Sequence, residues 1–270
     1  MEKRRVLFID SADPEEIKKA LDDGWRGVTT NPSLVAKNPS AEGKDFMEKY
    51  LNHMGKIVQV CRDDKYLRDK KYPSLSVEVF SLEPAEMIEQ ARYISGALGY
   101  KNLAIKIPIS YRVDGKTKNF LPVIKTLASH NFNINATCGF VAGQLELAAQ
   151  AGARFVSLFY NRLIDYNASE MGKDIGTDAQ VRPIEEVRNL AREKALQELR
   201  DTRRFLDNSS LDCEIILGSI RTSYDVTDGW KNGADIVTAG YKVAPGLLYH
   251  AGTDASVKGF DNELKAWLAK

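Results

Sequence analysis

Cysteine and histidine are scarce in this sequence, which has three residues of each type among 270. The cysteines Cys61, Cys138 and Cys213 are far apart and form no CxxC pair, so neither a common zinc motif nor a disulfide framework is indicated. The histidines are also scattered and do not form a set of metal ligands with the carboxylates. We therefore expect no metal site and reduced thiols, with Cys138 and Cys213 acting as small hydrophobic residues in or beside apolar runs.

An excess of charge is missing too, because 38 lysines and arginines face 37 aspartates and glutamates and leave a net charge of +1. This balance argues against an overall basic field that would attract nucleic acid, although a local group of arginines could still bind an anion. No apolar stretch approaches the roughly 20 residues of a membrane-spanning helix. The apolar run Val6–Ile9 is also too short for a signal peptide. We expect a cytoplasmic protein without a nucleic-acid or membrane partner.

Low-complexity segments and linkers are absent, and the length suits one large domain, residues 1–270, better than two. The chain contains instead a repeated unit, in which a short apolar run precedes a helical pattern. The apolar runs lie at 5–10, 27–31, 75–80, 103–109, 134–138, 154–159, 214–219 and 235–240. The helical patterns lie near 13–24, 43–61, 84–94, 118–129, 141–151, 183–207 and 223–232.

Two parts of the chain interrupt this regular pattern. A long polar loop is expected between the sixth apolar run and the charged helix near 183–207. Short helices are expected at the C-terminus, where Leu247, Leu248, Leu264 and Trp267 are apolar and Trp267 is expected to pack.

The alternation of apolar runs and helical patterns predicts the fold. Strands that alternate with helices form a parallel sheet, and eight such units in about 250 residues are typical of a closed (β/α)8 TIM barrel in the α/β class. A doubly wound, Rossmann-like sheet is the alternative. That fold would want a GxGxxG turn after the first strand, and the segment IDSADPEE (9–16) does not contain one.

A barrel of this kind places its active site at the C-terminal ends of its strands. Polar residues stand at these ends in the first seven runs: Asp10, Asn31, Glu78, Lys106, Thr137, Ser157 and Ser219. Among them Lys106 is unusual, because its neighbours in the run LAIKIPI (103–109) are apolar. Such surroundings disfavour the charged ammonium, and a neutral amine is a nucleophile towards carbonyl groups. The alternative is a lysine at a strand end that reaches solvent or pairs with an acid.

The other polar strand ends suggest partners for such a lysine. Asp10 and Glu78 are carboxylates on two other strands and could transfer protons together with a water molecule, although either acid alone could be a helix cap or an ion-pair partner. Ser219 and Arg221 follow the seventh run and could hold a phosphate, with Arg162 as a second arm. Barrels often bind phosphate in this region, but a surface arginine is the commoner fate of either arginine alone.

Eight segments of the chain resemble transaldolases, in particular the shorter branch that includes fructose-6-phosphate aldolases. The motifs TTNPS (29–33) and KIP (106–108) are the most specific of the matching residues. The segments follow the family's order and cover nearly the whole chain: FIDSADPEEIKKAL (8–21), GVTTNPSLVAK (27–37), SVEVFS (76–81), LAIKIPIS (103–110), NINATCGFVAGQ (133–144), AGARFVSLFYNRLIDY (151–166), EIILGSIRTSYDV (214–226) and GADIVTAGYKVAPGLL (233–248).

The resemblance implies roles for the candidate residues. Lys106 corresponds to the family's Schiff-base lysine, and Asp10 to the acid that handles the sugar hydroxyl proton during carbon–carbon cleavage. Glu78 and Thr137 correspond to the pair that holds the catalytic water. The remaining candidates correspond to groups around the substrate's hydroxyls, the intermediate and the phosphate: Thr29, Asn31, Asn135, Ser157, Phe159, Arg162, Ser219 and Arg221.

Two positions distinguish the branches of the family. Glu78 and Phe159 resemble transaldolases, whereas the aldolase branch has glutamine and tyrosine there. The tyrosine hydroxyl helps to release the enamine by protonation, so its absence favours transfer over simple lysis. The chain departs from the family in the long segments 110–120 and 167–181, of which the second could fold over the active-site mouth, and in Asn161, where glycine is common.

The resemblance therefore implies a class I transaldolase that needs no metal or organic cofactor and acts on sugar phosphates. It also implies a homo-oligomer, either a dimer or a pentamer-based ring. Two alternatives remain: a dihydroxyacetone aldolase on the same scaffold, and a sugar-phosphate-binding barrel without catalysis.

Overall fold

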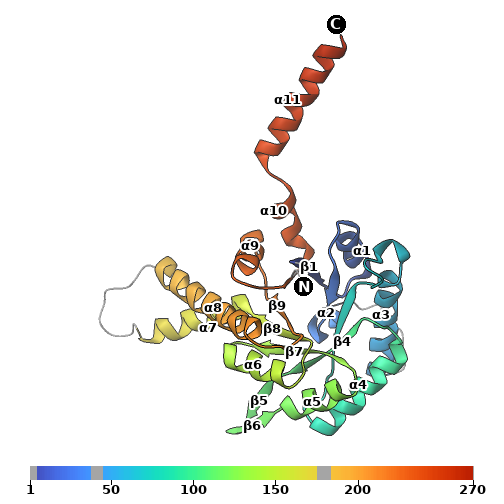
Figure 1. Ribbon diagram of the computed structural model, residues 1–270, viewed down its shortest axis with the longest axis vertical. Coiled ribbons are helices and arrows are strands. Elements are labelled where there is room, and N and C mark those ends of the chain that lie inside the picture. The colour runs from blue at the N-terminus through green and yellow to red at the C-terminus, as the bar shows by residue number, and fades with distance from the viewer. Residues whose placement is uncertain (1–4, 38–44, 175–183, 270) are drawn as a thin grey trace.

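The computed structural model describes residues 5–37, 45–174 and 184–269. Eight parallel strands close into a barrel in the order β1-β10-β9-β8-β7-β4-β3-β2, which confirms the predicted (β/α)8 fold (Figure 1). The strands are β1 (Val6–Asp10), β2 (Gly27–Thr29), β3 (Ser74–Glu78), β4 (Leu103–Pro108), β7 (Asn133–Gly139), β8 (Phe155–Phe159), β9 (Glu214–Gly218) and β10 (Ile236–Ala239).

Helices follow the barrel strands, and several begin where the sequence places a capping residue. Asp13 accepts a hydrogen bond from the backbone N–H of Glu15, and Pro14 stands at the first helical position of α1. The main helices are α1 (Pro14–Asp22), α2 (Pro32–Ala36), α3 (Phe46–Cys61), α4 (Pro84–Leu98), α5 (Leu121–Ser129), α6 (Ala142–Gln150), α7 (Tyr160–Asp174), α8 (Ile184–Asp207), α9 (Ser223–Lys231), α10 (Ala244–Leu248) and α11 (Ala251–Leu268). Short 3-10 turns lie at η1 (Asp64–Tyr66) and η2 (Tyr241–Val243).

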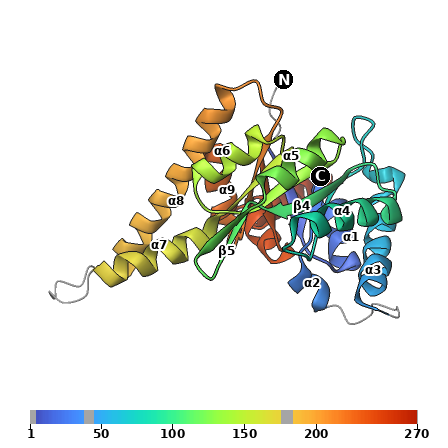
Figure 2. The ribbon, with the colours of Figure 1, turned by 90° about the horizontal axis from the view of Figure 1, so that it is seen from below.

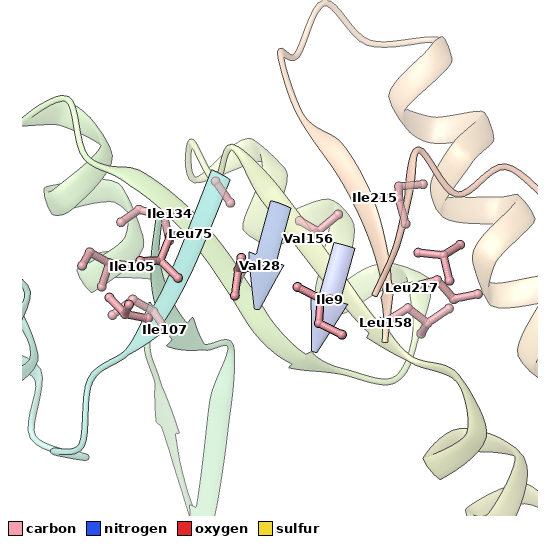
Figure 3. Close-up of a cluster of buried hydrophobic side chains, with 14 of the residues drawn as sticks. Ile9, Val28, Leu75, Ile105, Ile107, Ile134, Val156, Leu158, Ile215 and Leu217 are labelled. Atoms are coloured by element: carbon pink, nitrogen blue, oxygen red, sulfur yellow. The ribbon is translucent and has the colours of Figure 1, made fainter. Parts of the chain in front are cut away.

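The apolar core has two parts, because successive side chains of a strand point to opposite faces. One part packs the strands against the surrounding helices, and the side chains labelled in Figure 3 belong to it: Ile9, Val28, Leu75, Ile105, Ile107, Ile134, Val156, Leu158, Ile215 and Leu217. The other part is a separate buried cluster of the residues that alternate with these: Phe8, Ala104, Phe155, Ile216 and Ile236. This smaller cluster fills the barrel interior, as side chains do in barrels of this type.

The interior cluster explains where the polar residues must lie. On each strand, the side chain two residues after a residue of this cluster points to the same inner face. Each residue of the cluster is therefore followed by one at the C-terminal end of the barrel interior, and this second layer is polar or small: Asp10, Lys106, Ser157, Gly218 and Thr238. The apolar layer fills the barrel on the N-terminal side of the polar layer. The polar layer faces the C-terminal ends of the strands, where a site can form.

Two connections differ from the expectation. The long segment 110–120 is mostly a hairpin of β5 (Ser110–Val113) and β6 (Lys116–Asn119), which shortens the predicted helix to α5. The expected polar loop after the sixth apolar run is wrong for residues 160–174, because they form α7. Figures 1 and 2 show α7 and α8 side by side and extending away from the barrel, so residues 167–174 do not fold over its mouth. Residues 175–181 lie outside the described residues.

The C-terminus also corrects the sequence prediction. Residues 251–268 form one long helix, α11, in place of short ones, and none of its residues is buried. Figure 1 shows α11 standing away from the barrel, and the side chain of Trp267 is 70% exposed, so its expected packing within the chain is wrong. Within the described ranges, every helix is too short or too polar to cross a bilayer.

Candidate active site

A cavity of about 350 Å³ opens at the C-terminal ends of the barrel strands. Eleven of the twelve predicted site residues line it: Asp10, Thr29, Asn31, Glu78, Lys106, Asn135, Thr137, Ser157, Phe159, Arg162 and Ser219. The twelfth, Arg221, is not part of its lining. These eleven residues come from the first seven predicted strands or from the residues that directly follow them.

Lys106 lies on the inner face of β4 and is only 7% exposed. Its Nζ donates hydrogen bonds to Glu78 Oε2 at 2.9 Å and to the backbone oxygen of Thr30 at 2.7 Å. The strand register places Glu78 beside Lys106 on one side and Asn135 beside it on the other. The ammonium is thus held between a carboxylate and a carbonyl oxygen at the edge of the cavity, which compensates for its burial.

Asn135 is fixed by hydrogen bonds on both ends of its amide group. Ser157 Oγ donates to Asn135 Oδ1 at 2.7 Å, and Asn135 Nδ2 donates to Ser76 Oγ at 3.2 Å. All three side chains are buried. Ser157 and Asn135 therefore hold each other in fixed orientations next to Lys106, without any need for a ligand.

Asp10 ends β1 and is held by a short chain of hydroxyl groups. Thr29 Oγ1 donates to Asp10 Oδ1 at 2.8 Å and lies 2.6 Å from Thr238 Oγ1. Because Thr29 has only one hydroxyl hydrogen, Thr238 is the donor in the second bond. Burial raises the pKa of Asp10, against the opposing effects of the Thr29 hydrogen bond and the positive charges of Lys106 and Arg162.

The end of β7 is irregular where it meets the cavity. The register with β8 shifts between Ala136 and Gly139, and Cys138 has a φ of 60°, which is uncommon for a residue other than glycine. Thr137 Oγ1 is buried and forms no hydrogen bond with the described residues. Cys138 is half-buried and lines the cavity, while Cys213 is buried.

The two predicted phosphate arginines have different surroundings. The guanidinium carbon of Arg162 lies 5.1 Å from the ring centre of Phe159, and both residues line the cavity. Arg221 instead forms a two-pronged ion pair with Asp165 of α7, and its side chain is 44% exposed. The structure therefore brings Arg162 and Ser219 to the cavity and leaves Arg221 at its outside.

Sequence reasoning missed several residues of the site. Thr238 lines the cavity and comes from the eighth apolar run, where its position two residues after Ile236 was an available signal. Thr30 contributes only its backbone oxygen, which no side-chain pattern reveals.

Among the described residues, no three His, Cys, Asp or Glu side chains are grouped so as to hold a metal ion.

Comparison with known proteins identifies the family of the chain. Residues 7–270 match the family model described as transaldolase/fructose-6-phosphate aldolase. The chain is 36% identical over 262 residues to a probable transaldolase of Clostridioides difficile, a match that covers 97% of this chain and 96% of that protein. A probable transaldolase of Symbiobacterium thermophilum is 35% identical over 264 residues, with 97% of both chains covered. The chain therefore belongs to the transaldolase/fructose-6-phosphate aldolase family.

Proposed function

We propose that this protein is a class I transaldolase of the pentose phosphate pathway, in which Lys106 forms a Schiff base with a ketose phosphate. The donor is sedoheptulose 7-phosphate or fructose 6-phosphate, and the acceptor is an aldose phosphate. The observation that carries the proposal is the buried Lys106 amine. Its Nζ lies 2.9 Å from Glu78 Oε2, and Lys106 lines the same cavity as Asp10. Family membership supports a transaldolase-type reaction for this arrangement.

In the proposed reaction, Lys106 Nζ transfers a proton to Glu78 and attacks the C2 carbonyl of the donor. Glu78 returns this proton to the C2 oxygen of the carbinolamine, which leaves as water, and the resulting iminium ion withdraws electrons from the C3–C4 bond. Asp10 then takes the proton of the C4 hydroxyl. The C3–C4 bond breaks, an aldose leaves, and a dihydroxyacetone enamine remains on Lys106. Addition of this enamine to the acceptor aldehyde reverses the steps.

The loss and return of water need groups that hold a water molecule near C2. Thr137 and Glu78 are suited to this, because the Thr137 hydroxyl is buried without a hydrogen-bond partner among the described residues. An unpaired buried hydroxyl is unfavourable, so a bound water or substrate oxygen would stabilise it. Asn31 is suited to a substrate hydroxyl, because its Oδ1 accepts from Leu34 N and its amide nitrogen remains for the ligand.

Two further features support transfer between phosphorylated sugars. Phe159 has no hydroxyl group to protonate the enamine, which favours its transfer to an acceptor aldehyde. Arg162 and Ser219 line the cavity and are suited to bind a phosphate by charge-assisted hydrogen bonds. Arg221 would join them after leaving Asp165, an exchange that an exposed ion pair allows at little cost, about 1 kcal/mol or less.

The first experiment is borohydride reduction in the presence of fructose 6-phosphate, followed by peptide mass spectrometry. We expect a reduced dihydroxyacetone adduct on Lys106 and none after Lys106→Ala. The variant Lys125→Ala on the exposed face of α5 is the control and should keep the adduct. An unmodified Lys106 under trapping conditions would exclude the mechanism and leave a sugar-phosphate-binding barrel. Rapid release of dihydroxyacetone without an acceptor would indicate an aldolase.

We also propose that the protein is a homo-oligomer, a dimer or a pentamer-based ring. The support is α11, whose apolar residues Val257, Phe260, Leu264 and Trp267 are all more than half exposed. Their spacing of three or four places them on one face of the helix. In proteins most of the stability of a helix comes from packing of its apolar face, so an apolar partner would stabilise α11.

A further inference from the structure

The loop that follows β9 has an unusual backbone at the point where it meets the cavity. Ser219 lines the cavity and has a φ of 61°, in the left-handed region that residues other than glycine rarely adopt. Such a conformation is strained, and it persists only where the surroundings hold it in place. The groups that hold Ser219 therefore determine how it faces a ligand.

Two buried side chains, Asn161 of α7 and Asp225 of α9, supply these contacts. Each is only 4% exposed. Asn161 Nδ2 donates to the backbone oxygen of Ser219 at 2.9 Å and to Asp225 Oδ2 at 2.9 Å. Asp225 Oδ2 also accepts from the backbone N–H groups of Arg221 at 3.0 Å and Thr222 at 2.9 Å.

The arrangement joins three elements through one carboxylate oxygen. Asp225 Oδ2 accepts three N–H groups, and hydrogen bonds to an ionised, buried acceptor are among the stronger ones in proteins. Thr222 Oγ1 accepts from the N–H of Asp225 at 3.2 Å, which completes a capping box at the start of α9. Residues 219–222 are thus held without help from a ligand.

We infer that Asn161 and Asp225 are positioning residues, which hold the backbone of residues 219–222 so that Ser219 faces a terminal phosphate, and which thereby favour phosphorylated ketoses over unphosphorylated ones. This inference rests on the proposed function for the assignment of the cavity to a sugar phosphate. Neither side chain lines the cavity, and both act through the backbone of residues 219–222. Their contribution should therefore appear in phosphate affinity and not in the chemistry at Lys106.

The test compares kcat and KM for fructose 6-phosphate and for fructose in Asn161→Ala, Asp225→Ala and Asp225→Asn. We expect the ratio of the two kcat/KM values to fall about tenfold in the alanine variants, mainly through KM for the phosphorylated donor. Asp225→Asn keeps the shape of the side chain and should lower the ratio less, by about threefold. Asn167→Ala, on the same helix as Asn161, is the matched control and should leave the ratio unchanged.

A binding measurement separates this inference from the proposed function. Calorimetric titration with inorganic phosphate requires no turnover, and we expect its Kd to rise about tenfold in Asn161→Ala. Thermal melts identify the variants that fold. If Asp225→Ala does not fold, Asp225→Asn is used in its place to test the role of Asp225. Folded variants with an unchanged ratio and an unchanged phosphate Kd would overturn the inference. Absence of the Lys106 adduct in the unmodified enzyme would instead overturn the proposed function, whatever the phosphate Kd.

Discussion

At the scale of single residues, Asp10 is a carboxyl group whose pKa is raised by burial. Burial raises its pKa above the ordinary 3.8, while the Thr29 hydroxyl and the nearby charges of Lys106 and Arg162 oppose this effect. Glu78, a further carboxylate on the cavity, adds to the rise. The proposed base thus occupies surroundings that disfavour its charged form, which is common for catalytic groups and unfavourable for stability.

We expect Asp10→Asn to lower kcat by about 10²- to 10⁴-fold and yet to raise Tm at pH 7. Below the ordinary pKa, the Asp10 carboxyl is protonated in the folded and unfolded chains alike and does not affect stability. As pH rises from the ordinary to the raised pKa, only the unfolded chain ionises, so the native state loses stability across this window and does not regain it above.

Melting curves of both proteins between pH 4 and pH 8 measure this effect. The Tm advantage of Asp10→Asn should shrink as pH falls towards the ordinary carboxyl pKa. An advantage that stays constant with pH would show that Asp10 is not the group responsible. Thr29→Val serves as a second variant, because loss of its hydrogen bond should raise the Asp10 pKa further and move the acid limb of the kcat/KM profile to higher pH.

At the scale of elements, the irregular end of β7 links packing to the site. A Cβ atom on Gly139 would lie 2.8 Å from the backbone oxygen of Ser157 and would clash with a methyl carbon of Leu145. Only glycine therefore allows β7 to approach β8 and α6 here. The close approach follows the register shift that brings Thr137 and Cys138 to the cavity.

We expect Gly139→Ala to destabilise the fold by about 1–3 kcal/mol, because the backbone of β8 cannot move aside as a flexible side chain can. Denaturant unfolding measures the change. The control is Gly143→Ala in α6, where a Cβ meets no atom within 4 Å and where alanine favours the helix by about 1 kcal/mol. Equal stability of Gly139→Ala and the unmodified protein would contradict the packing argument.

At the scale of the whole molecule, the barrel and α11 differ in how they are stabilised. The barrel has an inner and an outer apolar cluster, whereas α11 has no buried residue at all. Its exposed face of Val257, Phe260, Leu264 and Trp267 is the kind of surface that associates with another apolar surface. A second copy of the chain is the partner that the proposed homo-oligomer requires.

We expect the double variant Phe260→Glu and Trp267→Glu to lower the mass of the assembly towards the 30.2 kDa of one chain. Two buried charges without partners at an interface would strongly disfavour association. Sedimentation velocity measures the mass, and Lys258→Glu on the same helix is the control that should leave it unchanged. A single-chain mass for the unmodified protein would rule out the proposed assembly.

The sequence predicted the barrel and most of the cavity, because both follow from local patterns. The order of apolar runs and helices identifies strands, and the C-terminal ends of parallel strands meet at one rim. Asp10, Glu78 and Lys106 were found in this way, from residues in three separate runs. The polar segment after β8 was misjudged, since α7 gains much of its stability from packing against α8, which is 10 residues further along the chain.

Lys106 shows what the sequence by itself determined: a lysine at the C-terminal end of an apolar strand, in a chain with the family's motifs, because apolar runs and motif spacing are local properties. Only the tertiary structure decided what each group touches. It paired Lys106 with Glu78, turned Arg221 towards Asp165, and placed Asn161 and Asp225 beneath the loop of Ser219. These contacts join residues 28 to 64 positions apart, and their geometry depends on barrel closure and side-chain packing, which no local pattern encodes.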